Sequence, residues 1–583
     1  MKKNLSVYRN VNLLLLANVM SLAFVMSFVL TGNVFAQFSK IPDTALTVTS
    51  KLLISSAEVR IANTSDGKIF IAWQQIEDVN GRNTATVRLQ LLDKDGNNLW
   101  EQGGILVSNK PTNDVVFKND LNLLLTSKNE AVVAVADFRT HNTARDIVLY
   151  KIDTSKGFVW GNDGVTAYSN ETNSAISAPS VAINDRNEVI VAVQTLNTTR
   201  INVINENGTK KLENDILVDG AKDLIVVKAP NGCFYAVYKM NNSLYADYYN
   251  PALTDEIKFL FKGRYVGRES GADLPENEEY WAVSDNEGGI FIIWKKSKLY
   301  IQRIDSEGIR LFEAEGISLS PTAENITNPI FSIDTTHKVV NIAWYNLFAS
   351  YSLLFQKVAF DGEVLLNEGG VNSVTDAGMR PAAMTTADNG QCLLITSKTN
   401  AATGGDELYL VNLLLEGENL FDAPKPVYIG SINIADPIIS TQTSIVSTNY
   451  RNQMVIAWYD EYLDATAIAS KHSVKAQNVA WNGTLGPGAS EVNIKESKFR
   501  GEDIAVYPNP VATNLFNIKY NSKNEQNISI NIYNVQGKLC HSFDFELVHG
   551  ENNILVNYSF DKGMYIVKLK LKNEDIYTNF IVE

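Results

Sequence analysis

A five-residue apolar segment recurs eight times along most of this 583-residue chain. Each copy is rich in β-branched and aromatic residues, as in IFIAW at 69–73. Runs of this length and composition suit short strands that are buried on both faces. The copies stand at 69–73, 132–136, 189–193, 233–237, 290–294, 340–344, 392–396 and 454–458. This repetition predicts an array of similar β-units.

A second repeated element follows most of these segments and contains a glycine. In LDKDGNNLW at 92–100, an apolar residue is followed by an acid, a glycine and a closing aromatic residue. The same frame, closed by an aromatic residue or leucine, recurs at 304–312, 358–366 and 413–421, with looser copies at 152–160 and 204–212. The Asp-Gly, Glu-Gly and Asn-Gly pairs predict two-residue hairpin turns, because such turns need positive φ. A short strand and a turn also precede most apolar segments, so four strands are expected in each unit.

Four antiparallel strands per repeat of roughly 50 residues are typical of a β-propeller blade. Residues 37–482 are therefore expected to form an all-β propeller of about eight four-stranded repeats. Two repeats are irregular, at 248–256 and 475–488, so seven blades stand as the alternative to the favoured eight. A solenoid or two stacked sandwiches would also fit the strands, but an unclosed array leaves sheet edges exposed.

Four of the apolar segments carry a tryptophan. Large flat side chains bury most area between packed sheets, so these residues are expected in the core between blades rather than in a ligand platform. They are Trp73, Trp294, Trp344 and Trp458.

The first 36 residues predict a secretory signal peptide. Basic residues precede an apolar run at 13–30, and VFA at 34–36 supplies a small-residue cleavage pattern. Cleavage is expected between Ala36 and Gln37. Because the apolar run is long, an uncleaved anchor is the alternative. No later stretch approaches the roughly 20 apolar residues of a membrane span, so none is expected after signal removal.

The net charge limits the classes of binding partner, and the cysteine content bears on whether disulfides form. The formal net charge is −14 and no basic run is visible, which argues against DNA, RNA or anionic lipid as partners. The three cysteines, Cys233, Cys392 and Cys540, lie far apart. They do not form a disulfide framework and are expected to pack as small apolar side chains.

The pattern changes near the C-terminus. Residues 483–503 are rich in glycine, serine and mixed charge, which predicts a linker. Residues 504–583 contain closely spaced alternating segments, which predict a small Ig-like β-sandwich. VYPNPV at 506–511 lies at the entry to this module. Proline cannot donate to a strand ladder, so its two prolines belong at an entry or an edge.

Four motifs follow one another in this module: VYPNPV, IYNVQGK, KGMYIVKLK and a final short strand that ends at Glu583. In this order they resemble the type A C-terminal sorting domain of the type IX secretion system of Bacteroidota. The matching positions are Tyr507, Pro508, Asn509, Pro510, Gly537, Gly563, Tyr565, Val567 and Lys568.

The resemblance implies a route of transport. The type IX secretion machinery would recognise the module, after the signal peptide has taken the chain across the inner membrane. A surface sortase would then remove the module near the linker. The remaining cargo would be attached to lipopolysaccharide at the outer membrane or released, so the expected location is the cell surface or the extracellular space. The resemblance says nothing about what the propeller does.

The sequence carries no recognisable catalytic, cofactor or metal motif. The five histidines lack zinc-ligand spacing, and neither a G-x-S-x-G elbow nor a phosphate loop occurs. The repeated glycine frame also differs in spacing from the Asp-box of sialidase propellers. Asp137, Asp460 and Glu461 follow apolar segments and are expected as solvated rim residues rather than catalytic acids.

Two functions of different class remain. The favoured one is a non-enzymatic secreted or surface protein that binds an extracellular protein or glycan through polar loops at 74–86, 138–146 and 459–467. The alternative is a propeller-fold hydrolase of glycans or peptides exported by the same route. That alternative requires a deep pocket with two carboxylates about 5–10 Å apart.

Overall fold

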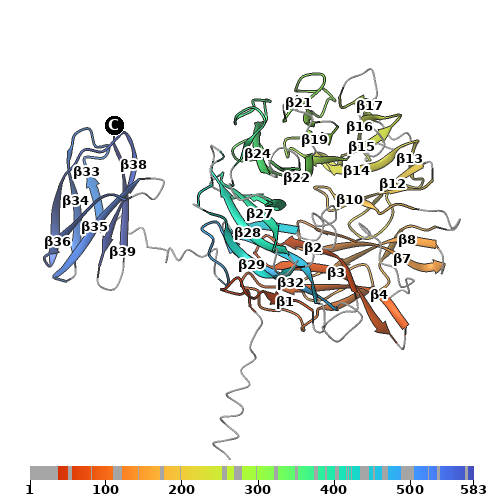
Figure 1. Cartoon of the computed structure of the whole chain (residues 1–583), viewed down its shortest axis with the longest axis horizontal. Helices are drawn as coiled ribbons and strands as arrows, with labels where there is room; N and C mark the ends of the chain where they lie inside the picture. Colours follow the sequence, from red (N-terminus) through yellow and green to blue (C-terminus); the bar gives the residue numbers. More distant parts are fainter. Residues whose placement is uncertain are drawn as a thin grey trace, which may run out of the picture. The chain divides into compact units, whose positions relative to one another are not determined.

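The computed structural model describes residues 37–487 and 504–582, apart from internal gaps. The longer gaps are 50–54, 109–120, 171–175, 252–258, 268–278, 321–325, 401–405, 433–444 and 463–470. Contacts divide the chain into two compact units, Met1–Ser490 and Glu491–Glu583. Both units are built from β-strands (Figure 1). Among the described residues, no helix has the length and apolar character needed to span a bilayer.

The described residues of the first unit form four-stranded antiparallel sheets, eight in number, which follow one another along the chain. The first three contain β2 (Ser55–Asn63), β3 (Ile69–Val79), β4 (Arg82–Leu92) and β5 (Ile105–Ser108); β6 (Leu121–Leu125), β7 (Ala131–His141), β8 (Ala144–Ile152) and β9 (Val165–Tyr168); and β10 (Ser180–Ile183), β11 (Val189–Gln194), β12 (Thr198–Ile204) and β13 (Ile216–Asp219). The next two contain β14 (Lys222–Lys228), β15 (Phe234–Met240), β16 (Ser243–Tyr249) and β17 (Phe259–Tyr265); and β18 (Tyr280–Ser284), β19 (Ile290–Lys295), β20 (Leu299–Ile304) and β21 (Ile317–Ser318).

The remaining sheets of this unit contain β22 (Ile326–Asp334), β23 (Val339–Asn346), β24 (Ser352–Ala359) and β25 (Val371–Asn372); β26 (Arg380–Thr386), β27 (Cys392–Thr399), β28 (Asp406–Leu413) and β29 (Lys425–Ile432); and β30 (Ile445–Tyr450), β31 (Gln453–Tyr462) and β32 (Lys471–Ala480), joined by β1 (Leu46–Thr47). In all but the last sheet, the strands pair in chain order. A single turn of 3-10 helix, Pro230–Gly232, lies between β14 and β15.

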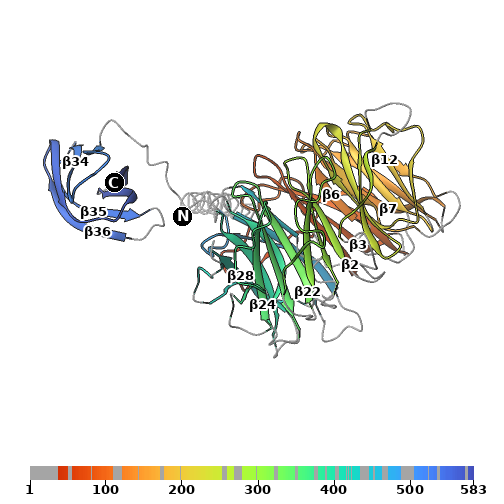
Figure 2. The ribbon, with the colours of Figure 1, turned by 90° about the horizontal axis from the view of Figure 1, so that it is seen from above.

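The sheets pack side by side and the series closes on itself. First strands of neighbouring sheets contact each other, as in β2 with β6 and β10 with β14 (Figures 1 and 2). Strand β30 of the last sheet contacts β2 of the first. The fifth and sixth sheets share a core that includes Phe291 and Trp344. This arrangement is propeller-like, with the first strand of each sheet innermost. Trp73, Trp294, Trp344 and Trp458 are buried in the cores between neighbouring sheets, which confirms the prediction for them.

The last sheet is completed by the N-terminal part of the chain. Strand β1 pairs antiparallel with β32, with Leu46 opposite Ala476. Leu46 and Phe38 enter a core that also contains Ile71 of the first sheet and Val455 of the last. A segment from one end of the unit therefore closes the series against its other end.

The glycine turns differ from the predicted two-residue hairpins. The Gly96 amide donates to the Asp93 carbonyl at 3.1 Å, and the Asp93 amide donates to the Asn97 carbonyl at 2.9 Å. Gly96 itself has φ +88°. The loop therefore contains three residues, with the glycine in the left-handed position that follows a type I turn. The prediction of a two-residue turn is wrong, because the acid before glycine occupies the turn rather than the left-handed site.

The closing residue of each glycine frame packs on the next sheet. The Trp100 indole donates to the Thr154 carbonyl at 3.1 Å, and the Trp160 indole donates to the Glu206 carbonyl at 3.0 Å. Trp160 also lies against Gly208, where an added Cβ would come within 2.8 Å of the indole. The same contact joins Phe312 to Gly362, Leu366 to Gly417 and, at the closure, Phe38 to Gly96. The residue before each closing side chain instead stays exposed at Leu99, Val159, Leu311, Leu365 and Leu420.

The second unit contains two antiparallel sheets over one hydrophobic core. One sheet has the order β33 (Ile504–Tyr507), β34 (Leu515–Ser522) and β37 (Gly550–Asn557). The other has the order β36 (Leu539–Leu547), β35 (Gln526–Asn534), β38 (Gly563–Lys570) and β39 (Asp575–Val582). Side chains that alternate along these strands, such as Ile518, Ile530 and Val567, are fully buried between the sheets. This accounts for the period-two pattern of the sequence.

Candidate functional site

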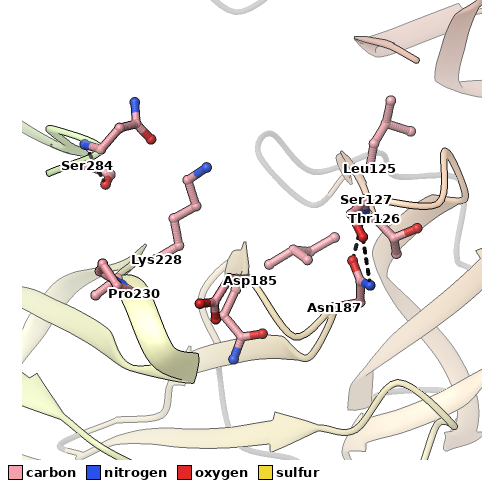
Figure 3. Close-up of a pocket in the computed structure, with 12 residues that line it drawn as sticks. Leu125, Thr126, Ser127, Asp185, Asn187, Lys228, Pro230 and Ser284 are labelled. Carbon is pink, nitrogen blue, oxygen red and sulfur yellow. Dashed lines mark hydrogen bonds between the residues drawn. The ribbon is translucent and has the colours of Figure 1, made fainter. Parts of the chain in front are cut away.

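A cavity of about 430 Å³ opens in the first unit between four consecutive sheets (Figure 3). It lies where the innermost strands β6, β10, β14 and β18 end and turn outward to the second strand of each sheet. Its lining is Leu125, Thr126, Ser127, Ile183, Asn184, Asp185, Asn187, Lys228, Ala229, Pro230, Ser284 and Asn286. A volume of this size is in the range of pockets that bind small molecules. We call it the turn cavity.

Hydrogen bonds from turn to turn hold one wall of the turn cavity. The Ser127 amide donates to Asn187 Oδ1 at 2.7 Å, and Asn187 Nδ2 donates to Ser127 Oγ at 2.9 Å. The Ser65 amide makes the equivalent bond to Asn129 Oδ1 at 2.9 Å one sheet earlier. Asn129 and Asn187 have φ of 61° and 58°, a conformation that asparagine tolerates better than most residues. The turns are therefore fixed relative to each other.

Asp185 supplies the carboxylate in the described lining, and its side chain accepts hydrogen bonds from the turn of the next sheet. Its two oxygens accept the backbone amides of Asn231 at 2.8 Å and Gly232 at 2.7 Å. Asn184 beside it caps its own turn by accepting the amides of Arg186 and Glu188, each at 3.0 Å. Both acceptor side chains are thus engaged in holding backbone.

Several cations of the neighbouring turns and strands are paired with acids, whereas Lys228 and Arg186 make no ion pair within the described residues. Lys151 pairs with Glu130 at 2.9 Å, Lys211 with Glu188 at 2.5 Å and Arg303 with Asp285 at 2.7 Å, and Lys68 pairs with Asp66. The Lys228 ammonium has no ion-pair or hydrogen-bond partner within the part of the chain that the structure describes. Figure 3 shows its side chain extending from the end of β14 into the space between the turns.

The acids considered from the sequence do not converge on the turn cavity. Asp137 is 2% exposed and pairs with Arg139 at 2.8 Å, so its placement on a solvated rim is wrong. It is buried because β7 continues past it to His141. Asp460 and Glu461 lie on β31, and their side chains are outside the described residues. No three His, Cys, Asp or Glu side chains gather as a metal site in the described ranges.

The loops expected to carry binding contacts are partly strand. Residues 74–86 form the β3–β4 hairpin, in which Val79 pairs with Arg82, and most of 138–146 belongs to β7 and β8. Strand β31 likewise runs to Tyr462, into the 459–467 segment. The strands continue through these polar segments, because the backbone pairing extends past the residues that are packed between neighbouring sheets.

A buried side-chain amide that sequence reasoning missed supports five of the glycine turns. Gln90 Nε2 donates to the Glu101 carbonyl at 2.8 Å, and Gln90 Oε1 accepts the Leu91 amide at 2.9 Å. The same pair of bonds is made by Gln302 and Gln356, and Gln477 reaches the Thr44 carbonyl at the closure. The available signal was a Gln or Asn six residues before the frame's glycine, at positions 90, 202, 302, 356 and 477.

In the second unit, VYPNPV contacts the last strand. The Ile581 amide donates to Asn509 Oδ1 at 2.9 Å, and the Val511 amide donates to the Ile581 carbonyl at 2.7 Å. The bonds Tyr507–Pro508 and Asn509–Pro510 are cis. The Tyr507 hydroxyl donates to Asn553 Oδ1 at 2.9 Å on β37 of the same sheet. Two motifs separated by about 70 residues in the sequence are therefore joined at the backbone of one residue.

The third motif lies along β38 and is mostly packed inside. Gly563 pairs with Val582 at the end of the ladder. Tyr565 is buried, stacks on Phe580 at 5.5 Å between ring centroids and donates its hydroxyl to the Asp561 carbonyl. Val567 is fully buried and Lys568 half-buried.

Two predicted positions, Gly537 of the sorting motif and Ala36 of the cleavage site, fall outside the described residues. Gln37 is described and directly precedes the buried Phe38.

The architecture and the C-terminal motifs define an exported all-β protein with a separate C-terminal sorting unit. Residues 505–583 match the secretion system C-terminal sorting domain family. These residues belong to that family, so the chain is cargo of the type IX secretion machinery. It is exported to the cell surface or the extracellular space.

Comparison with known proteins adds no activity. No curated protein matches the chain. Prolyl oligopeptidase B from Galerina marginata is 10% identical with a TM-score of 0.34, over 59% of this chain and 46% of that chain. A puromycin-hydrolysing peptidase from Mycobacterium tuberculosis is 11% identical with a TM-score of 0.36, over 75% and 62% respectively. The β-propeller domain of the trilobed protease from Pyrococcus furiosus is 11% identical with a TM-score of 0.34, over 61% and 94%. The chain thus spans about half the length of the first of these.

Proposed function

We propose that the first unit is an eight-bladed β-propeller that binds an extracellular protein or glycan without catalysing a reaction. The turn cavity carries this proposal. It offers an ammonium group, hydroxyls and a carboxamide, whereas Asp185 is engaged by two backbone amides. Hydrolysis of a glycosidic bond requires two carboxylates that are free to act as acid and base or nucleophile. The arrangement therefore favours binding over the propeller-fold hydrolase.

The domain organisation belongs to the same proposal. Residues 1–36 are a signal peptide cleaved between Ala36 and Gln37, residues 37–482 the propeller, and 504–583 an Ig-like sorting sandwich beyond a linker within 483–503. Phe38 supports the cleavage, since it is 2% exposed and its amide donates to the Asp95 carbonyl at 3.2 Å. Cleavage there leaves the exposed Gln37 directly before this buried position.

The sorting residues act in two ways in this proposal. Asn509, Tyr565 and Val567 hold the fold of the sorting unit, through the contacts with the last strand and the core. Tyr507 is 42% exposed and, with the exposed Pro508 and Pro510, offers motif surface to the secretion machinery. A surface sortase then removes the unit within the linker, as is usual for such cargo in Bacteroidota, and the propeller is anchored at the outer membrane or released.

The exported chain, purified from the producing cells, tests the binding function on an array of glycans and extracellular proteins. Retention of one array member with no change in its mass is expected. Release of shortened glycan or peptide products would establish the hydrolase instead. Deleting residues 504–583 is expected to leave the chain in the periplasm, and normal surface display of that truncation would contradict the sorting role.

A further inference from the structure

We propose that the turn cavity binds the carboxylate of an acidic sugar residue, with Lys228 as its cationic contact. This rests on the proposed binding function and names its site and ligand class. An ammonium group that lines a cavity and is not paired with a carboxylate attracts an anion through its charge.

Several cations near the cavity are paired with acids, which distinguishes them from Lys228 and from Arg186 on the adjoining turn. The chain carries 65 acids and 51 Lys and Arg residues, so carboxylates are in excess. Cations of the surrounding turns and adjoining strands, such as Lys151, Lys211 and Arg303, each have an acid within 2.5 to 2.9 Å. Lys228 lies among the same turns and has none in the described residues.

The carboxylate in the described lining of the cavity is engaged by backbone amides and not by Lys228. Asp185 lines the same cavity, but its two oxygens accept the amides of Asn231 and Gly232. Arg186 follows it and adds positive charge, with its guanidinium lying against Gly232. The oxygens of Asp185 are therefore directed toward the backbone amides, and the Lys228 ammonium is the cationic group of the lining that is left for a ligand.

The other polar groups of the lining suit a sugar. Ser284 Oγ accepts the Asn286 amide, and Ser127 Oγ accepts Asn187 Nδ2, so both serine hydroxyl protons remain for donation. The Asn286 carboxamide has no partner of its own among the described residues. Hydroxyls and carboxamides pair with the hydroxyl groups of a sugar ring. Leu125, Ile183 and Pro230 supply apolar surface for its carbon face.

A peptide carboxyl terminus fits less well. Captured peptide carboxylates are commonly held by clusters of free backbone amides. The amides of Asn231 and Gly232 would be such a cluster, but Asp185 already occupies them. The anion must therefore be met by side chains, as expected for a ligand that also presents hydroxyl groups.

Isothermal titration of the full exported chain with D-galacturonate, D-glucuronate and N-acetylneuraminate tests the proposal, with D-galactose and D-glucose as neutral counterparts. At least one acid is expected to bind ten-fold or more tightly than the neutral sugars, and to bind less tightly in high salt. Lys228→Gln is expected to weaken that binding ten-fold or more. Lys210→Gln is the matched control, because Lys210 is exposed on a turn outside the cavity. Unchanged unfolding of both variants excludes a folding defect.

Equal binding by Lys228→Gln, equal binding of neutral sugars, absence of binding by all three acids, or preference for a peptide with a free carboxyl terminus would each overturn the proposal. These results separate it from the broader function. If the chain still retains an array partner while Lys228→Gln has no effect, the site is wrong but the binding protein stands. If no array member is retained either, both fail.

Discussion

The contact between Phe38 and Gly96 gives the sharpest test of how the first unit closes. In Gly96→Ala, the new Cβ would lie 2.7 Å from the Phe38 amide nitrogen and 2.8 Å from its ring. The left-handed backbone at φ +88° costs an L-residue about 1–2 kcal/mol. Displacing the phenyl ring adds part of the roughly 1.5–3 kcal/mol that burial of such a side chain contributes. We expect a total loss of about 2–4 kcal/mol in the free energy of unfolding.

Gly161→Ala is the matched control for this experiment. Gly161 has φ +85°, but no atom lies within 4 Å of an added Cβ, so only the backbone cost of about 1–2 kcal/mol applies. Urea unfolding of the exported chain measures both variants. In a Phe38→Ala background, the effect of Gly96→Ala is expected to fall but to stay above that of Gly161→Ala, because the ring contact is removed while the close approach to the amide nitrogen of residue 38 remains. Equal costs for the two glycines in the natural background would refute the reasoning.

Further predictions concern the sorting unit and the buried thiols. Asn509→Ala removes the acceptor for the Ile581 amide and is expected to lower the stability of the sorting unit by about 0.5–1.5 kcal/mol. Immunoblots should then show a smaller fraction of the chain at the cell surface. Asn527 is exposed on β35, so the control variant Asn527→Ala should be exported normally. Burial raises the pKa of the Cys392 thiol to about 12, so in the folded chain Ellman's reagent should label the partly exposed Cys540 before Cys392. Because the unfolded thiol ionises near pH 8.5, the contribution of Cys392 to stability is present below that pH and is lost as pH rises toward 12. Denaturation midpoints that stay constant from pH 8 to 11 would contradict this.

Much of the sheet architecture could be predicted from the sequence, because it follows from local signals. The apolar segments mark the second strand of each sheet, where both faces are covered by neighbouring sheets. The turn glycines mark the hairpin between the third and fourth strands. What these signals could not supply was the length of the hairpins at 74–86 and 138–146. Polar residues were taken as loops there, whereas strand pairing continues past the packed layer.

The turn cavity was beyond reach from the sequence for a different reason. Its lining comes from four turns spread over about 160 residues, and each turn alone looks like an ordinary solvent-exposed connection. Only the closed series of sheets brings Ser127, Asp185, Lys228 and Asn286 to one place. The unpaired state of Lys228 also depends on the orientation of Asp185 toward the next turn, which no local pattern encodes.

The repeated glycine frame also contributes to packing between neighbouring sheets, in addition to forming a turn. Its glycine and its closing side chain do not serve the same sheet: the closing side chain packs on the glycine of the following repeat, as Phe312 does on Gly362. A linear series built this way leaves the first glycine, Gly96, without a partner from a preceding repeat. Phe38 fills that place, and the Thr44 carbonyl accepts the amide of Gln477, as a carbonyl shortly before the fourth strand does in other sheets. The segment before the first repeat is therefore the missing part of the last sheet, and a domain boundary drawn at the first apolar segment would open the ring.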